Sequence, residues 1–246
     1  ARNVISGNSA QGIILNDTGT MNNTVEGNFI GLNAAGTGAV PNNYSGVAIV
    51  GGAQANVIGG GPGARNFISG NNSQGIWIGD TGTSANVVRG NTIGMDAQHA
   101  NTVFNNSICL LISGGATGNV IGGTALGDAN LMMNKPAADS VQIVDAGTMN
   151  NMVRGNSILG TAGRAIALYS SGNNEAPAPT LSSATMTTNL TVSGSLNSTP
   201  YTTFTLDYYA SPSPTAGQAQ TWLGSTNVTT GAGGNATFTH ALPAIV

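Results

Sequence analysis

Charged side chains are scarce in this chain. Six residues are Lys or Arg and nine are Asp or Glu, so charged residues make up only 6% of the 246. With so few basic groups and a formal net charge of −3, the sequence offers no positive surface for the phosphates of a nucleic acid. Apolar residues still reach 40%, which separates the chain from disordered sequences. We therefore expect a folded protein without a nucleic-acid partner.

Cysteine and long apolar runs are also nearly absent. Cys109 is the only cysteine, and it lies within residues 108–112, an uninterrupted apolar run that no other run in the chain exceeds. One thiol cannot form an internal disulfide, and this run is far shorter than the roughly 20 residues that cross a bilayer. The sequence therefore predicts no membrane insertion, and Cys109 is interpreted as a buried apolar side chain. The low charge favours an extracellular or cell-surface location.

Glycine is abundant instead, with Gly at 37 positions, and asparagine is nearly as common. Both rank low in helix propensity, which excludes long helices. The chain also repeats itself: RNVISGN at 2–8 returns as RNFISGN at 65–71, and GIILNDTGT at 12–20 returns as GIWIGDTGT at 75–83. Both pairs have the same offset of 63, and a more divergent third copy spans residues 130–160. A fixed period of this length indicates a repeat architecture.

Short apolar pieces closed by Gly, Asn, Asp or Ser fill each repeat and predict strands and turns. Such strands can form successive coils of a parallel solenoid. Dividing the repeat by three gives roughly 21 residues per coil, so we expect about eight coils over residues 1–175. Asparagines of the SGN, EGN and RGN turns suit corners, because Asn tolerates left-handed backbone and its amides can stack in ladders. These corner residues are Asn8, Asn28, Asn71, Asn91 and Asn156.

The alternation of side chains along a strand predicts which of them point inward. The inward set is apolar: Ile13, Leu15, Ile76, Ile78, Val141, Ile143, Ile166 and Leu168. The residues between them form a mixed set, namely Ile14, Trp77, Gln142 and Ala167. A mixed set of this kind is typical of a face turned toward solvent or a partner.

The repeated RNVISGN, GIILNDTGT and NTVEGNFIG segments resemble the right-handed parallel β-helix repeats of the pectin-lyase-like superfold, found in secreted and surface proteins of bacteria. The resemblance covers residues 1–175 and implies a right-handed parallel β-helix. Members of this superfold include polysaccharide lyases and hydrolases as well as adhesins. The fold alone therefore assigns no activity.

The pattern changes after Glu175, where the repeat ends and residues 176–246 begin a second domain. Segments rich in alternating Thr, Val, Phe and Tyr predict a small antiparallel β-sandwich. The run FTLDYYASP with the following QTWLGSTNVTTGAGGNATFTHALPA resembles a bacterial immunoglobulin-like module. Such modules carry one more strand after the last proline-containing turn, so we expect an incomplete sandwich.

Carboxylates show no catalytic clustering in the sequence. Asp17, Asp80 and Asp145 share one repeat position, and three coils of about 4.8 Å would separate them by roughly 14 Å. This exceeds the roughly 5 to 9.5 Å of a glycosidase pair, so we interpret these residues as turn formers. Asp96 with His99 is the remaining catalytic candidate. No spacing typical of a metal or cofactor site occurs, and we expect no catalytic, metal or cofactor-binding residues.

The leading hypothesis is a non-enzymatic extracellular protein of structural or adhesive role. The alternative is a carbohydrate-active or carbohydrate-binding β-helix, similar to a polysaccharide lyase or hydrolase. In that alternative, Trp77 on the outward face would stack against a glycan.

Besides a glycan, we expect a second copy of this chain as a partner. Residues 1–6 already match the middle of a repeat, so the first coil is expected to have an open edge. The incomplete sandwich is expected to leave another open edge or groove. These two complementary edges predict a head-to-tail contact that extends as a fibre or surface layer. The alternative is that the sequence is a fragment of a longer chain, whose other parts supply the cap and the strand.

Overall fold

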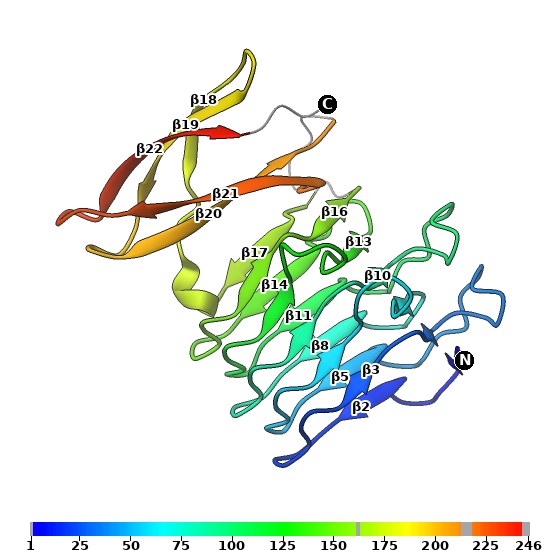
Figure 1. Cartoon of the computed structure of the whole chain (residues 1–246). Helices are drawn as coiled ribbons and strands as arrows, with labels where there is room; N and C mark the ends of the chain where they lie inside the picture. The colour runs from blue at the N-terminus through cyan, green and yellow to red at the C-terminus, as the bar shows by residue number, and fades with distance from the viewer. Residues whose placement is uncertain (1, 161–162, 213–217, 243–246) are drawn as a thin grey trace. The chain divides into compact units, whose positions relative to one another are not determined.

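The computed structural model describes residues 2–160, 163–212 and 218–242. Strands dominate these residues, and their one helical segment is a short 3-10 turn, η1 (Gly172–Glu175). No described helix is long and apolar enough to cross a membrane. Residue contacts divide the chain into two compact units, Ala1–Glu175 with Ser211–Gln220 and Ala176–Ala210 with Thr221–Val246 (Figure 1).

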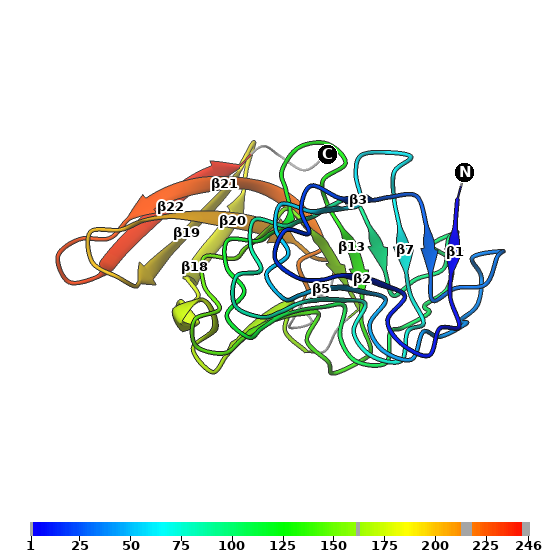
Figure 2. The ribbon, with the colours of Figure 1, turned by 90° about the horizontal axis from the view of Figure 1, so that it is seen from below.

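The strands of the first unit form three parallel sheets, so this unit is the parallel β-helix that the sequence predicts. The first sheet contains β1 (Val4–Ile5), β4 (Phe29–Ile30), β7 (Phe67–Ile68), β10 (Thr92–Ile93), β13 (Leu131–Met133) and β16 (Ser157–Leu159). Figure 2 shows several strands of this sheet side by side. The second contains β2 (Ile13–Leu15), β5 (Val47–Ile49), β8 (Ile76–Ile78), β11 (Leu110–Ile112), β14 (Val141–Val144) and β17 (Ile166–Tyr169). The third contains β3 (Thr24–Val25), β6 (Val57–Ile58), β9 (Val87–Val88), β12 (Val120–Gly122) and β15 (Met152–Arg154).

The sequence repeat spans two coils, and the expectation of three was wrong. Phe29 pairs with Val4 on one side and with Phe67 on the other, and Phe67 is the residue one full repeat after Val4. Half of the repeat gives a coil of about 31 residues. The two larger sheets hold six strands each, so the described β-helix has six coils instead of about eight. The coils are long partly because two corner loops are inserted, residues 33–38 and 96–101, each bounded by an isolated bridge.

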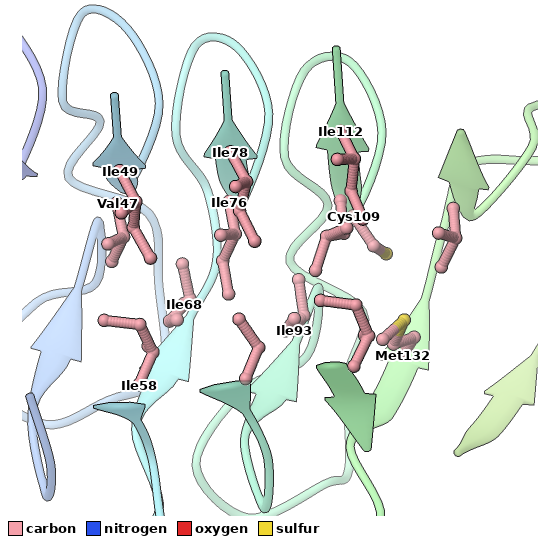
Figure 3. Close-up of a cluster of buried hydrophobic side chains, with 14 of the residues drawn as sticks. Val47, Ile49, Ile58, Ile68, Ile76, Ile78, Ile93, Cys109, Ile112 and Met132 are labelled. Atoms are coloured by element: carbon pink, nitrogen blue, oxygen red, sulfur yellow. The ribbon is translucent and has the colours of Figure 1, made fainter. Parts of the chain in front are cut away.

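The alternation of side chains places the predicted inward residues in one continuous core. Ile76, Ile78, Val141 and Ile143 are at most 1% exposed, as predicted. Figure 3 shows how isoleucines of the second sheet face those of the other two sheets across the interior. Cys109 lies in this core, and burial raises the pKa of its thiol to about 12. Its interpretation as a buried apolar residue is therefore confirmed.

The end strands of the second sheet follow the alternation less closely. Ile13 and Leu15 in β2 and Leu168 in β17 pack against the core but stay partly exposed. Ile166 was expected inside and Ala167 outside, yet Ile166 is 39% exposed and Ala167 only 1%. The reason for the exposed isoleucine is that β17 ends its sheet, so no further coil of that sheet covers Ile166.

Three ladders of asparagine side chains run along the corners of the β-helix. In each ladder, the Nδ2 of one Asn donates to the Oδ1 of the Asn in the next coil, at 2.7–3.1 Å. The ladders are Asn3, Asn28, Asn66, Asn91, Asn130 and Asn156; Asn23, Asn56, Asn86, Asn119 and Asn151; and Asn8, Asn42, Asn71 and Asn105. All five asparagines interpreted as corners belong to them, which confirms that prediction.

The last coil of the β-helix is partly covered by a segment from later in the chain. The backbone of Ala219 forms an antiparallel bridge with Ile158 of β16. The Ile158 N–H donates to the Ala219 carbonyl at 2.9 Å, and the Ala219 N–H returns the bond at 3.2 Å. The edge of β16 that faces away from β13 is therefore paired at this point.

The second unit contains two antiparallel sheets. One holds β18 (Thr180–Met186), β19 (Leu190–Asn197) and β22 (Asn235–Leu242), and the other holds β20 (Thr203–Ala210) and β21 (Thr221–Thr229). Their shared core includes Val192, Leu206, Tyr208 and Phe238. All seven residues of β18 are exposed, and an apolar cavity of about 230 Å³ remains between β18 and the other strands. This small antiparallel part follows the β-helix as the sequence predicts.

Candidate functional site

The outward face of the second sheet carries aliphatic, aromatic and amide side chains next to one another. The strand register aligns Ala48, Trp77, Leu111 and Gln142 in one row across β5, β8, β11 and β14. Trp77 therefore lies in the middle of the row, on the outward face to which the sequence assigns it. Its neighbours in the row are apolar and small or medium in size, so the indole extends beyond them.

Two residues fix the orientation of the Trp77 side chain. Gly79 follows it on the same face, and a Cβ at Gly79 would lie 2.7 Å from Cε2 and from Nε1 of the indole. The Nε1–H donates to Oγ of Ser113, one coil away, at 3.0 Å. Because glycine leaves room for the ring and Ser113 holds its far edge, the indole lies along the sheet as a platform.

An open groove of about 300 Å³ lies beside this platform. Its lining residues are Gln11, Tyr44, Ser45, Ser73, Gln74, Trp77, Leu111 and Ser113. None of them is charged. Tyr44 is 54% exposed, so the groove has a second accessible aromatic ring. The groove therefore combines aromatic surface with neutral amides and hydroxyls.

Hydrogen bonds within the groove orient the amide of Gln74. Its Oε1 accepts from Oγ of Ser45 at 3.0 Å and from Oγ of Ser73 at 2.7 Å. These two bonds occupy the acceptor oxygen of the amide and leave its Nε2 pointing away from Ser45 and Ser73. In the part of the chain that the structure describes, Nε2 has no hydrogen-bond partner. Gln74 thus offers donors to a ligand.

The aspartates at the shared repeat position lie in turns. Since one repeat is two coils, Asp17, Asp80 and Asp145 are separated by only about 10 Å, not the expected 14 Å or so. That separation lies just beyond a glycosidase pair, so distance alone argues weakly against one. The stronger argument is that Asp80 and Asp145 accept the N–H groups of Gly51 and Gly114 in neighbouring turns, while all three aspartates have φ between 74° and 80°. These contacts are those of turn residues.

Asp96 and His99 belong to a corner loop and are not paired as a catalytic dyad. The Asp96 carboxylate accepts the Ala100 N–H at 2.8 Å and two bonds from Asn101. Burial raises its pKa, but these hydrogen bonds outweigh burial and hold the pKa below its usual range. His99 lies against Thr92, 2.9 Å from its hydroxyl, and burial lowers the pKa of its imidazole. The carboxylate is thus engaged in closing the loop.

A charged cluster that the sequence analysis missed lies in the last two coils of the same sheet. The Tyr169 hydroxyl donates to Asp139 and accepts from Arg164, each at 2.6 Å. Asp139 also accepts from Gln142 and from the backbone of Arg164. Burial raises the pKa of Asp139, whereas these bonds and the Arg164 charge lower it by more. Asp139 and Tyr169 lie one coil apart, so only the coil length reveals the cluster.

Among the described residues, no three His, Cys, Asp or Glu side chains lie close enough together to hold a metal ion. No protein-family model matches the chain, and no curated protein matches it. The groove beside Trp77 is therefore interpreted from its own geometry.

Substitution of Gly79 tests how the platform is held. In a Trp222→Phe background, Trp77 is the only tryptophan of the chain, so its fluorescence reports the indole alone. We expect Gly79→Ala to displace the ring from the sheet and to increase its quenching by acrylamide. Gly61→Ala is the matched control, because a Cβ there meets nothing within 4 Å. Equal quenching in the two variants would show that Gly79 does not position the indole.

Proposed function

We propose that this protein is a non-enzymatic extracellular β-helix of structural or adhesive role that binds carbohydrate in the Trp77 groove. The single observation that carries this proposal is an indole held along the sheet beside neutral hydrogen-bonding groups. Indole faces stack on the apolar faces of sugar rings, while amides and hydroxyls bond to sugar hydroxyls. The low charge of the chain supports a place outside the cell.

Binding is favoured over turnover by the residues that line the groove. Glycoside hydrolysis requires two suitably placed carboxyl groups, and the lining contains none. The carboxylate of Asp139, in the coil beyond Leu111, already accepts bonds from three other residues. A lyase-like or hydrolase-like activity, which remains the alternative, lacks this support.

Trp77→Ala should weaken glycan binding at least about tenfold, a loss of about 1.4 kcal/mol that matches one stacking contact. The measurement is calorimetric titration of the whole chain with a panel of soluble oligosaccharides. Tyr201→Ala is the control, since Tyr201 is an aromatic residue with 77% exposure outside the groove. Equal affinity in wild type and Trp77→Ala would refute the proposal. Release of new reducing ends or unsaturated products would favour the enzymatic alternative.

A further inference from the structure

We infer that the Trp77 groove takes a linear, uncharged glycan that lies along the axis of the β-helix. This inference rests on the proposed function and adds the class and direction of the ligand. Two features of the groove carry it: the coils from which its lining comes, and the absence of charge among the lining residues.

The lining residues come from four successive coils. Gln11 precedes β2, Tyr44 precedes β5, Trp77 lies in β8, and Leu111 lies in β11. These strands are consecutive neighbours in the second sheet. At about 4.8 Å per coil, the groove extends about 14 Å along the axis. A single sugar ring covers only part of that length, so an extended chain of several sugars fits it better.

The groove contains no positively charged side chain that would neutralise the carboxylate of an acidic sugar. All eight lining residues are neutral, and the amide and hydroxyl groups among them match uncharged hydroxyls. The cations of the later coils are already engaged: Arg164 bonds to Tyr169 and lies 3.6 Å from Asp139, and Lys135 donates to Asn106. A uronate would lose hydration without gaining a cation, which disfavours its binding.

The orientation of the Gln74 amide indicates which hydrogen-bonding group a ligand must present to it. Ser45 and Ser73 occupy its Oε1, so its amide presents N–H donors. A neutral sugar hydroxyl accepts such bonds while its ring rests on the indole. Leu111 continues the apolar floor into the next coil, where it pairs with Trp77. The ligand is thus recognised by ring faces along the floor and by hydroxyls along one side.

The test is calorimetric titration of the full chain with neutral cello-, manno- and xylo-oligosaccharides and with oligogalacturonates, at low and high salt. We expect at least one neutral series to bind, with affinity rising from the disaccharide to the tetrasaccharide and changing less than about twofold with salt. Oligogalacturonates should bind at least about tenfold more weakly than that series. Tighter binding of oligogalacturonates, or full affinity for a monosaccharide, would overturn the inference.

A variant that introduces a charge helps to distinguish failure of this inference from failure of the proposed function. Gln11→Lys places a cation in the groove and should create salt-dependent binding of oligogalacturonates, whereas Gln54→Lys, at an isolated β-bridge outside the groove, should not. Wild-type binding of an acidic glycan that Trp77→Ala abolishes would refute the inference and keep the proposed function. Absence of binding to every glycan would refute both.

Discussion

The side-chain amide of asparagine is the group on which this β-helix depends. Asn86 shows the full pattern: its Nδ2 donates to Asn119 and to the Ala53 carbonyl, and its Oδ1 accepts two bonds from Asn56. Its exposure is 0%, so each of these polar atoms would be left unsatisfied without the neighbouring coils. A buried polar atom that loses its partner costs about 1–3 kcal/mol. The amides therefore require that coils stack in one register.

This constraint also explains how such short strands place a functional side chain. Most strands of the β-helix contain only two or three residues, too few to fix their own register. Two of the ladders immediately precede the strands of the first and third sheets, with Asn66 before Phe67 and Asn86 before Val87. The third ladder lies at the corner ahead of the second sheet, with Asn71 shortly before β8. Each coil then delivers its outward residue to the same row. Trp77 is held in this row, and the space above Gly79 lets its ring lie along the sheet.

The sequence was sufficient for the parallel β-helix, the asparagine corners and the outward position of Trp77, because repeat and alternation are local patterns. It did not reveal the coil length, since three short coils and two long coils fill the same repeat equally well. The shorter coil would place Asn56 and Gln98 beside Trp77, whereas the true register places Ala48 and Leu111 there. The contacts of Trp77 with Ser113, and of Asp139 with Tyr169, follow only from the longer coil.

The most direct test of the account compares two adjacent asparagines. Asn71 is 1% exposed and belongs to a ladder, where it bonds to Asn42, Asn105 and the Ile30 carbonyl, while Asn72 is exposed. The measurement is the urea midpoint of Asn71→Ala and of Asn72→Ala by circular dichroism, with hydrogen exchange of the coils. If the amide ladders hold the coils in register, Asn71→Ala loses about 2–4 kcal/mol of stability and exchanges faster in the adjoining coils, against a loss of less than about 0.5 kcal/mol for Asn72→Ala. Equal stability of the two variants would contradict this role of the ladders.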